Sequence, residues 1–372
     1  MEVCMKPLNI GNLKVSIPIV QGGMGVGISM SNLSSAVAQQ GGVGVISAAG
    51  LGMFENNRTR DYLEASLNRL TTEIRKAKKK TEGALGVNIM VAMNGFGDHV
   101  KTAIREKIDI IFAGAGLPLD LPRYLKKGVN TKLVPIISSA RAAKIITEKW
   151  LRNFDYLPDA FVIEGPKAGG HLGFKKKELE DPDYQLETLL SKTRTALEPY
   201  EDRHHASIPL IVAGGVFDGA DMHRFLRAGA QGVQLGTRFV ATEECDASSV
   251  FKDMYVQAES SDVRLVDSPV GLPGRAIRNA FLKAVDAGET HPFSCPFECI
   301  STCKKEDAPY CISLALYNAQ RGHMKRGFAF AGANVGRVKR IVSVAELFKE
   351  LKEGYAKTEE LSRGNLTLSK NG

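Results

Sequence analysis

The chain has 372 residues, of which 44% are hydrophobic and 24% charged, so it can bury a sizeable core and lacks the composition of a disordered or fibrous protein. Its formal net charge is +8, but no nucleic-acid-binding motif accompanies that charge, and we expect no nucleic-acid partner. The apolar runs fall short of the ~20 residues that a membrane-spanning helix needs, and the N-terminal stretch has no apolar signal core. We therefore expect a cytoplasmic protein without a membrane partner.

Eight short β-branched runs occur in the first 240 or so residues, and each leads into a glycine-rich turn and a longer amphipathic segment. They are "SIPIVQGGMG", "GGVGVISAAG", "GALGVNIM", "IDIIFAGAG", "KLVPIISS", "DAFVIEG", "IPLIVAGG" and "GVQLGTRF". Near-continuous apolar strands indicate burial on both faces, and strand–helix alternation predicts parallel pairing. Eight such units favour an α/β fold of the (β/α)8 TIM barrel type over a doubly wound sheet, with the functional face at the carboxyl ends of the strands.

The pattern changes after Phe239. The following segment has a helical pattern, carries the cysteine cluster and shows no further strand pattern. We expect a TIM-barrel domain over residues 1–244, a helical insertion over 245–325, and a glycine-rich loop with a closing helix over 326–372 that returns to the barrel.

The last two strand ends, in "IVAGGVFDG" and "VQLGTRF", predict a phosphate site. In barrels of this type the loops after strands seven and eight often bind phosphate. Backbone N–H groups of Gly214, Gly215, Gly236 and Thr237 can approach an anion closely, and Thr237 adds a hydroxyl. A phosphate-bearing cofactor is expected, and the alternative is that the glycines only form tight turns.

The first strand ends in "QGGMGVG", which lacks the spacing of a dinucleotide-binding fingerprint. A flat ring packed against Gly22, Gly23 and Met24 fits these residues better. Asn88, in "GVN" at the end of the third strand, offers a donor and an acceptor to the edge of an isoalloxazine ring. The alternative is that Asn88 caps the next helix.

Together these motifs resemble those of a known family. "PIVQGGMGVG", "GVN", "EGPKAGGHLG", "IVAGGV", "VQLGTRF" and "SPVGLPGRAIRN" are similar, over nearly the whole chain, to motifs of the flavin-dependent nitronate monooxygenase family, which includes the flavin enoyl-acyl-carrier-protein reductases. The resemblance implies an FMN-binding TIM barrel. It implies flavin contacts at Gly22, Gly23, Met24, Asn88, Gly169, Gly170, Gly214, Gly215, Gln234, Gly236 and Thr237.

His171 stands in the glycine-rich stretch "AGGH" after the sixth strand. An imidazole with its ordinary pKa of ~6.5 exchanges a proton near neutral pH, so we expect His171 to be the general base. A structural histidine is the alternative. The family resemblance implies the catalytic role, because the catalytic histidine of the family matches this position.

Four cysteines lie in "CPFECISTCKKEDAPYC": Cys295, Cys299, Cys303 and Cys311. Their spacing places the first three on one face of a helix, whose first turn Pro296 suits. Four thiolates suit a [4Fe–4S] cluster, while zinc and unligated helix cysteines remain alternatives. The layout also resembles the bacterial decanoyl-acyl-carrier-protein dehydrogenase/isomerase branch, which pairs FMN with an iron–sulfur cluster and has a longer last cysteine gap.

Three functions are compatible with these features. The first is nitronate oxidation by dioxygen, with His171 deprotonating neutral nitroalkanes. The second is dehydrogenation and isomerisation of an acyl thioester, or reduction of an enoyl thioester, with an acidic acyl carrier protein as partner. The third is flavin storage, against which the glycine-flanked histidine argues. The family as a whole favours nitronates, the cysteines and basic charge favour acyl thioesters, and a homodimer is compatible with either.

Overall fold

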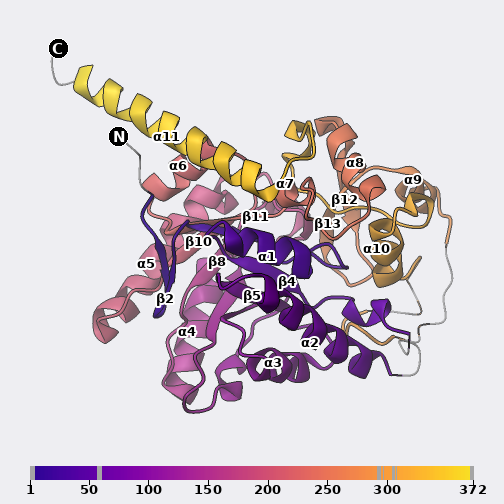
Figure 1. The fold of residues 1–372 in the computed structure, drawn as a ribbon, viewed down its shortest axis with the longest axis horizontal. Coiled ribbons are helices and arrows are strands. Elements are labelled where there is room, and N and C mark those ends of the chain that lie inside the picture. Colours follow the sequence, from indigo (N-terminus) through magenta and orange to yellow (C-terminus); the bar gives the residue numbers. More distant parts are fainter. Residues whose placement is uncertain are drawn as a thin grey trace.

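The computed structural model describes residues 5–56, 61–290, 295, 297–303, 306 and 308–368, the last five by their backbone alone. Eight parallel strands form one sheet, in the order β3 (Ile19–Gln21), β11 (Gly232–Leu235), β10 (Leu210–Ala213), β8 (Phe161–Glu164), β7 (Lys132–Ile137), β6 (Ile110–Gly114), β5 (Leu85–Met90) and β4 (Gly44–Ser47). A parallel bridge between Val20 and Val43 joins the two end strands, so the sheet closes into a barrel (Figure 1). All eight predicted strands and the α/β barrel are confirmed.

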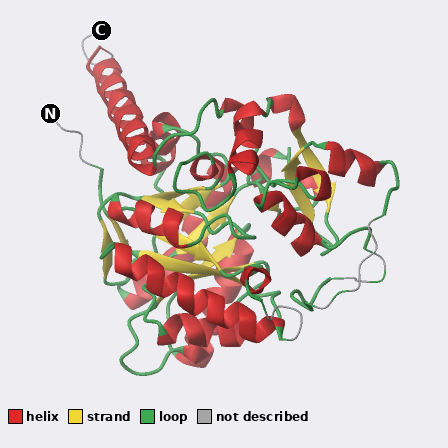
Figure 2. Ribbon diagram, turned by 45° about the vertical axis from the view of Figure 1, so that its right-hand side comes forward, coloured by secondary structure: helices red, strands yellow, loops and turns green. Residues whose placement is uncertain are grey.

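Helices lie between the strands and surround the barrel, as Figure 2 shows. Ser139 and Asp218 cap two of them by accepting hydrogen bonds from Ala142 N and Asp221 N, as is usual for these residue types. The helices that follow barrel strands are α1 (Ser31–Gln39), α2 (Tyr62–Lys80), α3 (Phe96–Arg105), α4 (Ala140–Phe154), α5 (Leu186–His204), α6 (Gly219–Arg227) and the short α7 (Thr237–Val240).

The barrel interior is filled by alternate residues of the strands. Val20, Val45, Phe112, Val162 and Ile211 belong to one buried cluster there, because successive strand residues point to opposite faces. A hairpin that the sequence analysis did not predict, β1 (Leu8–Ile10) and β2 (Leu13–Val15), adds its apolar side chains to the same cluster. It lies at the amino ends of the strands and so leaves the carboxyl ends open for a site.

The expectation of an all-helical insertion was wrong. Residues 245–325 contain α8 (Ser249–Gln257), α9 (Ala280–Asp286) and α10 (Ile312–Gln320), but also the antiparallel strands β12 (Val263–Asp267) and β13 (Pro273–Ile277). β13 also pairs with β9 (Gly170–His171), about a hundred residues earlier in the chain, and this second partner is not visible in the local pattern. Val266, Phe281 and Tyr310 of this region form a small separate core, to which Phe328 from the following segment also belongs.

The chain ends in the expected closing helix, α11 (Val344–Leu368), which packs on α6 (Figure 1). A Cβ atom on Gly219 would lie under 3.0 Å from backbone atoms of α11, so glycine permits this close approach. None of the described helices has the length and apolar character needed to cross a bilayer. Single 3-10 turns occur at Leu51–Phe54, Leu121–Tyr124, Lys176–Glu178, Pro182–Tyr184, Ser260–Asp262, Met324–Arg326 and Val335–Arg337.

Candidate active site

The carboxyl ends of β3, β5 and β11 bring four of the expected flavin contacts together. Asn88 lies between two residues that face the surrounding helices, so its side chain points into the barrel, and Gln234 does the same in β11. A Cβ atom on Gly22 would lie 3.4 Å from the Gln234 amide, and one on Gly23 would lie under 3.0 Å from Asn88. The strand ends therefore form one compact surface that consists largely of glycine backbone, with few side chains.

Asn88 does not cap a helix. It lies within β5, and α3 begins after Gly95, so the capping alternative is wrong. The Asn88 backbone oxygen accepts a hydrogen bond from Ala48 N at 2.9 Å. Among the described residues nothing hydrogen-bonds its side-chain amide, which leaves one donor and one acceptor for a ligand.

The loops after β10 and β11 approach each other as the phosphate-site expectation requires. Gly214 and Gly215 have φ of 79° and 131°, and Gly236 directly precedes α7. A Cβ atom on Gly236 would meet the Met24 sulfur at 3.5 Å, which places Met24 beside this loop. The residues present fit a phosphate group, because bare backbone gathers here at the open end of the barrel.

Residues 331–334 cover these two loops, and no local sequence pattern indicated this contact. Thr237 Oγ1 accepts a hydrogen bond from Gly332 N at 3.0 Å. The hydroxyl that was predicted to bind phosphate therefore already has a partner within the chain. Asn334 Nδ2 donates to Gly215 O, also at 3.0 Å. A Cβ atom on Gly169 would lie 2.5 Å from Ala331 C. Gly169 therefore serves a close contact between two backbone segments.

The insertion holds the loop that carries His171. Gly170 and His171 pair with Arg275 and Gly274 of β13. Arg275 Nη1 donates hydrogen bonds to Pro166 O at 2.5 Å and Ala168 O at 2.6 Å. Strand β13 thus holds the loop after β8 in two ways, by backbone pairing and by the Arg275 side chain. Gly170 has a φ of 79° and open space where a Cβ atom would lie.

The His171 ring contacts Ser268 and Phe330. Its Nε2 lies 2.7 Å from Ser268 Oγ, and its ring meets Phe330 edge to face at 5.0 Å between centroids. Burial lowers the pKa of His171 to about 4, so the imidazole is neutral at pH 7 and can accept a proton. Ser268 begins the motif "SPVGLPGRAIRN", but neither this motif nor the sequence around Phe330 predicted a contact with His171, because both residues lie far from His171 in the chain.

Glu164, the last residue of β8, is a second titratable group at this end of the barrel. It follows Val162 on the inward face of the strand. Burial raises the pKa of Glu164 to about 7. The carboxyl group is therefore largely protonated at slightly acid pH and can donate a hydrogen bond there.

The four cysteines converge on one cavity but not on a helix. Cys295, Cys299, Cys303 and Cys311 all line it, together with residues that include Glu298 and Ser313. The described residues from Cys295 to Cys303 are not helical, and Glu298 has a φ of 42°, so the helical-face prediction was wrong; Pro296 lies outside the described residues. Burial raises the pKa of Cys311 to about 11 and that of Cys299 above its ordinary value.

Two observations bear on a metal at this cavity. Among the described residues the buried Tyr62 hydroxyl has no hydrogen-bond partner, and its pKa is raised mainly by burial and further by the nearby Cys299 and Cys311. Within the described part of the chain, however, no three His, Cys, Asp or Glu side chains stand close enough to hold a metal ion. The four thiols are therefore suitable ligands for a metal, but their positions are too far apart to bind one.

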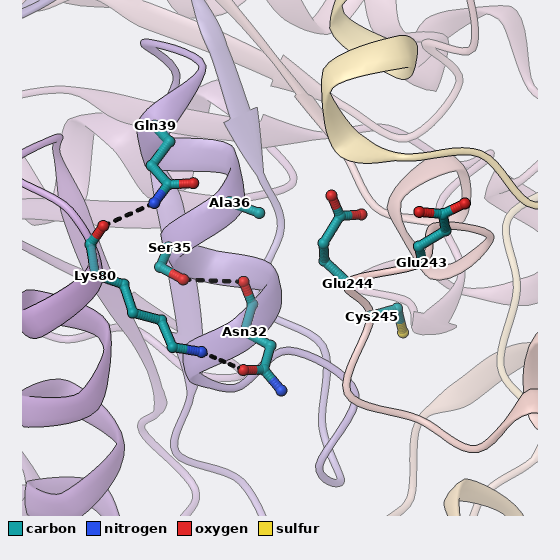
Figure 3. A pocket seen from close by; sticks show the side chains of 8 residues that line it. All are labelled: Asn32, Ser35, Ala36, Gln39, Lys80, Glu243, Glu244 and Cys245. Carbon is teal, nitrogen blue, oxygen red and sulfur yellow. Dashed lines mark hydrogen bonds between the residues drawn. The ribbon is translucent and has the colours of Figure 1, made fainter.

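A larger open cavity, of about 540 Å³, lies elsewhere and contains none of the expected site residues (Figure 3). It is lined by α1, the end of α2 and residues 243–245. Lys80 reaches Asn32, and Gln39 Nε2 donates to Lys80 O at 2.7 Å. Because several of its polar groups bond one another and none of the predicted site residues lines it, we assign the site to the barrel mouth and not to this cavity.

Comparison with known proteins identifies the family. Residues 6–354 match the family model described as nitronate monooxygenase. The chain belongs to the nitronate monooxygenase family. Members of this family are flavin enzymes, and the chain is accordingly an oxidoreductase.

Individual relatives are distant. An octahydro-indene-carboxyl-CoA dehydrogenase of Mycobacterium tuberculosis is 28% identical over 271 residues, which are 73% of this chain and 66% of that protein, just under two thirds. A probable nitronate monooxygenase of Staphylococcus aureus is 25% identical over 313 residues, 74% of this chain and 79% of that protein.

Two solved structures share the fold over nearly the whole chain. FabK from Thermotoga maritima has a TM-score of 0.72 and 27% identity, and the match covers 94% of this chain and 96% of that one. A nitroalkane oxidase from Streptomyces ansochromogenes has a TM-score of 0.71 and 20% identity, with 93% and 97% covered, and supports the fold alone.

Proposed function

We propose that the chain is an FMN-dependent oxidoreductase that oxidises nitronates with dioxygen and uses His171 as its general base. The observation that carries this proposal is the neutral, buried imidazole of His171 on a glycine-flanked loop at the carboxyl end of the barrel. Family membership supports the same reaction class. The nitronate itself is the substrate class named for the Staphylococcus aureus relative.

The cofactor would be held by the residues that the strand ends bring together. The loops with Gly214, Gly215, Gly236 and Thr237 would bind the phosphate of FMN through backbone N–H groups. The ring contacts would come from Gly22, Gly23, Met24, Asn88 and Gln234, with Gly169 and Gly170 on the neighbouring loop. Bound FMN supplies an acceptor for the electron pair of the substrate.

His171 would act on the proton. A neutral nitroalkane must lose the proton on the carbon beside its nitro group, and an unprotonated imidazole nitrogen can take that proton. A nitronate has already lost it and needs only to be positioned. His171 is therefore expected to matter more for neutral substrates than for nitronate anions.

The second candidate is chemistry on acyl thioesters, either acyl-carrier-protein dehydrogenation with isomerisation or enoyl-acyl-carrier-protein reduction. The likeness to FabK and to a CoA-ester dehydrogenase, both near 27% identity, favours it. His171 would then take the proton beside the thioester carbonyl. The net charge of +8 would suit an acidic carrier protein.

We further propose that Cys295, Cys299, Cys303 and Cys311 bind a [4Fe–4S] cluster. Support comes from four thiols on one cavity and the unpartnered Tyr62 hydroxyl beside them. Binding would require the four thiols to come closer together, since no three of the described His, Cys, Asp or Glu side chains stand close enough to hold a metal ion. Such a chain would act in the cytoplasm, where thiols stay reduced.

The direct test is to identify the cofactor and its dependence on the site. Protein denatured after purification should release FMN and not FAD, as chromatography of the supernatant would show. His171→Ala should retain FMN but lose at least ~10²-fold in turnover of a neutral nitroalkane. Release of FAD, or full activity of this variant on a neutral substrate, would contradict the proposal.

A further inference from the structure

Ser268 contacts the proposed base from a different part of the chain. It lies in the turn between β12 and β13, is 7% exposed, and its Oγ is 2.7 Å from His171 Nε2 across 97 residues of sequence. Its backbone is fixed within the turn: Ser268 N donates to Leu272 O at 3.2 Å, and Gly271 N donates to Ser268 O at 2.9 Å. The hydroxyl is therefore held in place against the imidazole.

The hydrogen bond has two possible directions, and they have opposite consequences. If Nε2 carries the ring proton, it donates to Ser268 Oγ, and Nδ1 keeps an unprotonated lone pair. If the serine hydroxyl donates to Nε2, the ring proton is on Nδ1, and neither nitrogen can take another proton without breaking the bond. Among the described residues no group hydrogen-bonds Nδ1 of His171.

We propose that Ser268 is a positioning residue for His171: by accepting the Nε2–H hydrogen bond it selects the tautomer in which Nδ1 is the base. This inference rests on the proposed role of His171. Phe330 completes the arrangement, because its edge-to-face contact fixes the plane of the imidazole ring.

The proton balance follows from that arrangement. The substrate C–H bond breaks, its electron pair stays on the substrate, and the proton binds to Nδ1. The ring is then a cation, and its Nε2–H still donates to Ser268 Oγ, now as a stronger, charge-assisted hydrogen bond. Ser268 thus stabilises the protonated ring without itself exchanging a proton with the substrate.

The first experiment measures the tautomer directly. Purified FMN-bound protein with ¹⁵N-labelled histidine is observed by NMR at pH 7, and the His171 signals are assigned by their loss in His171→Gln. We expect a neutral ring with its proton on Nε2, and a loss of this single tautomer in Ser268→Ala. A proton on Nδ1 would overturn the proposal, and so would an unchanged tautomer in the alanine variant.

The second experiment compares substrates. Ser268→Ala should slow anaerobic flavin bleaching by a neutral nitroalkane by roughly 10- to 100-fold, as loss of a hydrogen bond to a charged group implies, while bleaching by the nitronate changes little. Ser268→Thr keeps a hydroxyl and should restore most of the rate, and Ser261→Ala, at an exposed position before the same hairpin, is the matched control.

Equal losses on the two substrates, or no loss on the neutral one, would overturn the role of Ser268. Retained FMN and an unchanged melting temperature separate that result from misfolding. If the unmodified protein is bleached by neither nitroalkane nor nitronate, the proposed function fails, and the NMR experiment still decides whether Ser268 sets the tautomer.

Discussion

Gly23 packs so closely on Asn88 that a Cβ atom on Gly23 would lie under 3.0 Å from the Asn88 Cβ. Both residues stand at the carboxyl end of the barrel, so the shape of the proposed ring site depends on this contact. Gly23→Ala should displace Asn88, destabilise the protein by about 1–3 kcal/mol as overpacking does, and lower flavin retention. Thermal unfolding and the flavin-to-protein absorbance ratio would measure both effects.

Gly236→Ala is the matched comparison. Its Cβ atom would make only an ordinary 3.5 Å contact with Met24, and its φ of −115° is open to alanine. The apoprotein should keep its stability, while FMN retention should fall if the phosphate lies against this backbone. Unchanged flavin content in both variants would contradict the cofactor site.

Arg275 links the insertion to the catalytic loop through Pro166 O and Ala168 O. Arg275→Met keeps an unbranched apolar stem but removes both hydrogen bonds, which should cost about 1–3 kcal/mol locally. Hydrogen exchange of residues 165–171 should accelerate, and turnover should fall. Arg278→Met, at an exposed position just beyond β13, should change neither, and equal exchange in both variants would count against the link.

Burial of His171 makes stability depend on pH. Its pKa is about 4 in the folded protein and about 6.5 in the unfolded chain, so between these values only the unfolded chain binds the proton. The stabilisation is fully present above pH 6.5 and is lost as pH falls through 4. Relative to apoprotein with His171→Gln, the unmodified apoprotein should lose free energy of unfolding over this range in denaturant titrations. Parallel curves for the two proteins would show that the ring is not buried in a neutral form.

Iron content tests the cysteine proposal. Anaerobically prepared protein should carry about four iron and four sulfide per chain alongside the flavin. Cys299→Ser should lose the iron and lower the melting temperature, because metal bound only by the folded state stabilises it. Cys245→Ser, which changes a buried thiol outside the cavity, should keep the iron. Iron-free anaerobic preparations would reject the cluster.

The barrel could be predicted from sequence because each of its strands is a local apolar run, and most of these runs lead into glycine-containing loops. Asn88 and His171 were found in the same way, since Asn88 lies within such a run and His171 lies in the loop that follows one. The β12–β13 hairpin was missed because its stability depends on pairing with β9 and on a core shared with Phe328. Ser268 was missed as a partner of His171 for the same reason, and the regular spacing of the cysteines suggested a helix where Glu298 adopts a left-handed conformation.

The central claim is tested most directly by anaerobic bleaching of the bound flavin, with substrates offered one at a time. We predict that a nitronate bleaches it rapidly in both the unmodified protein and His171→Ala, and that a neutral nitroalkane bleaches the variant at least ~10²-fold more slowly than the unmodified protein. No bleaching by nitronates, with rapid bleaching by a saturated acyl-carrier thioester, would contradict nitronate oxidation and establish the thioester reaction in its place.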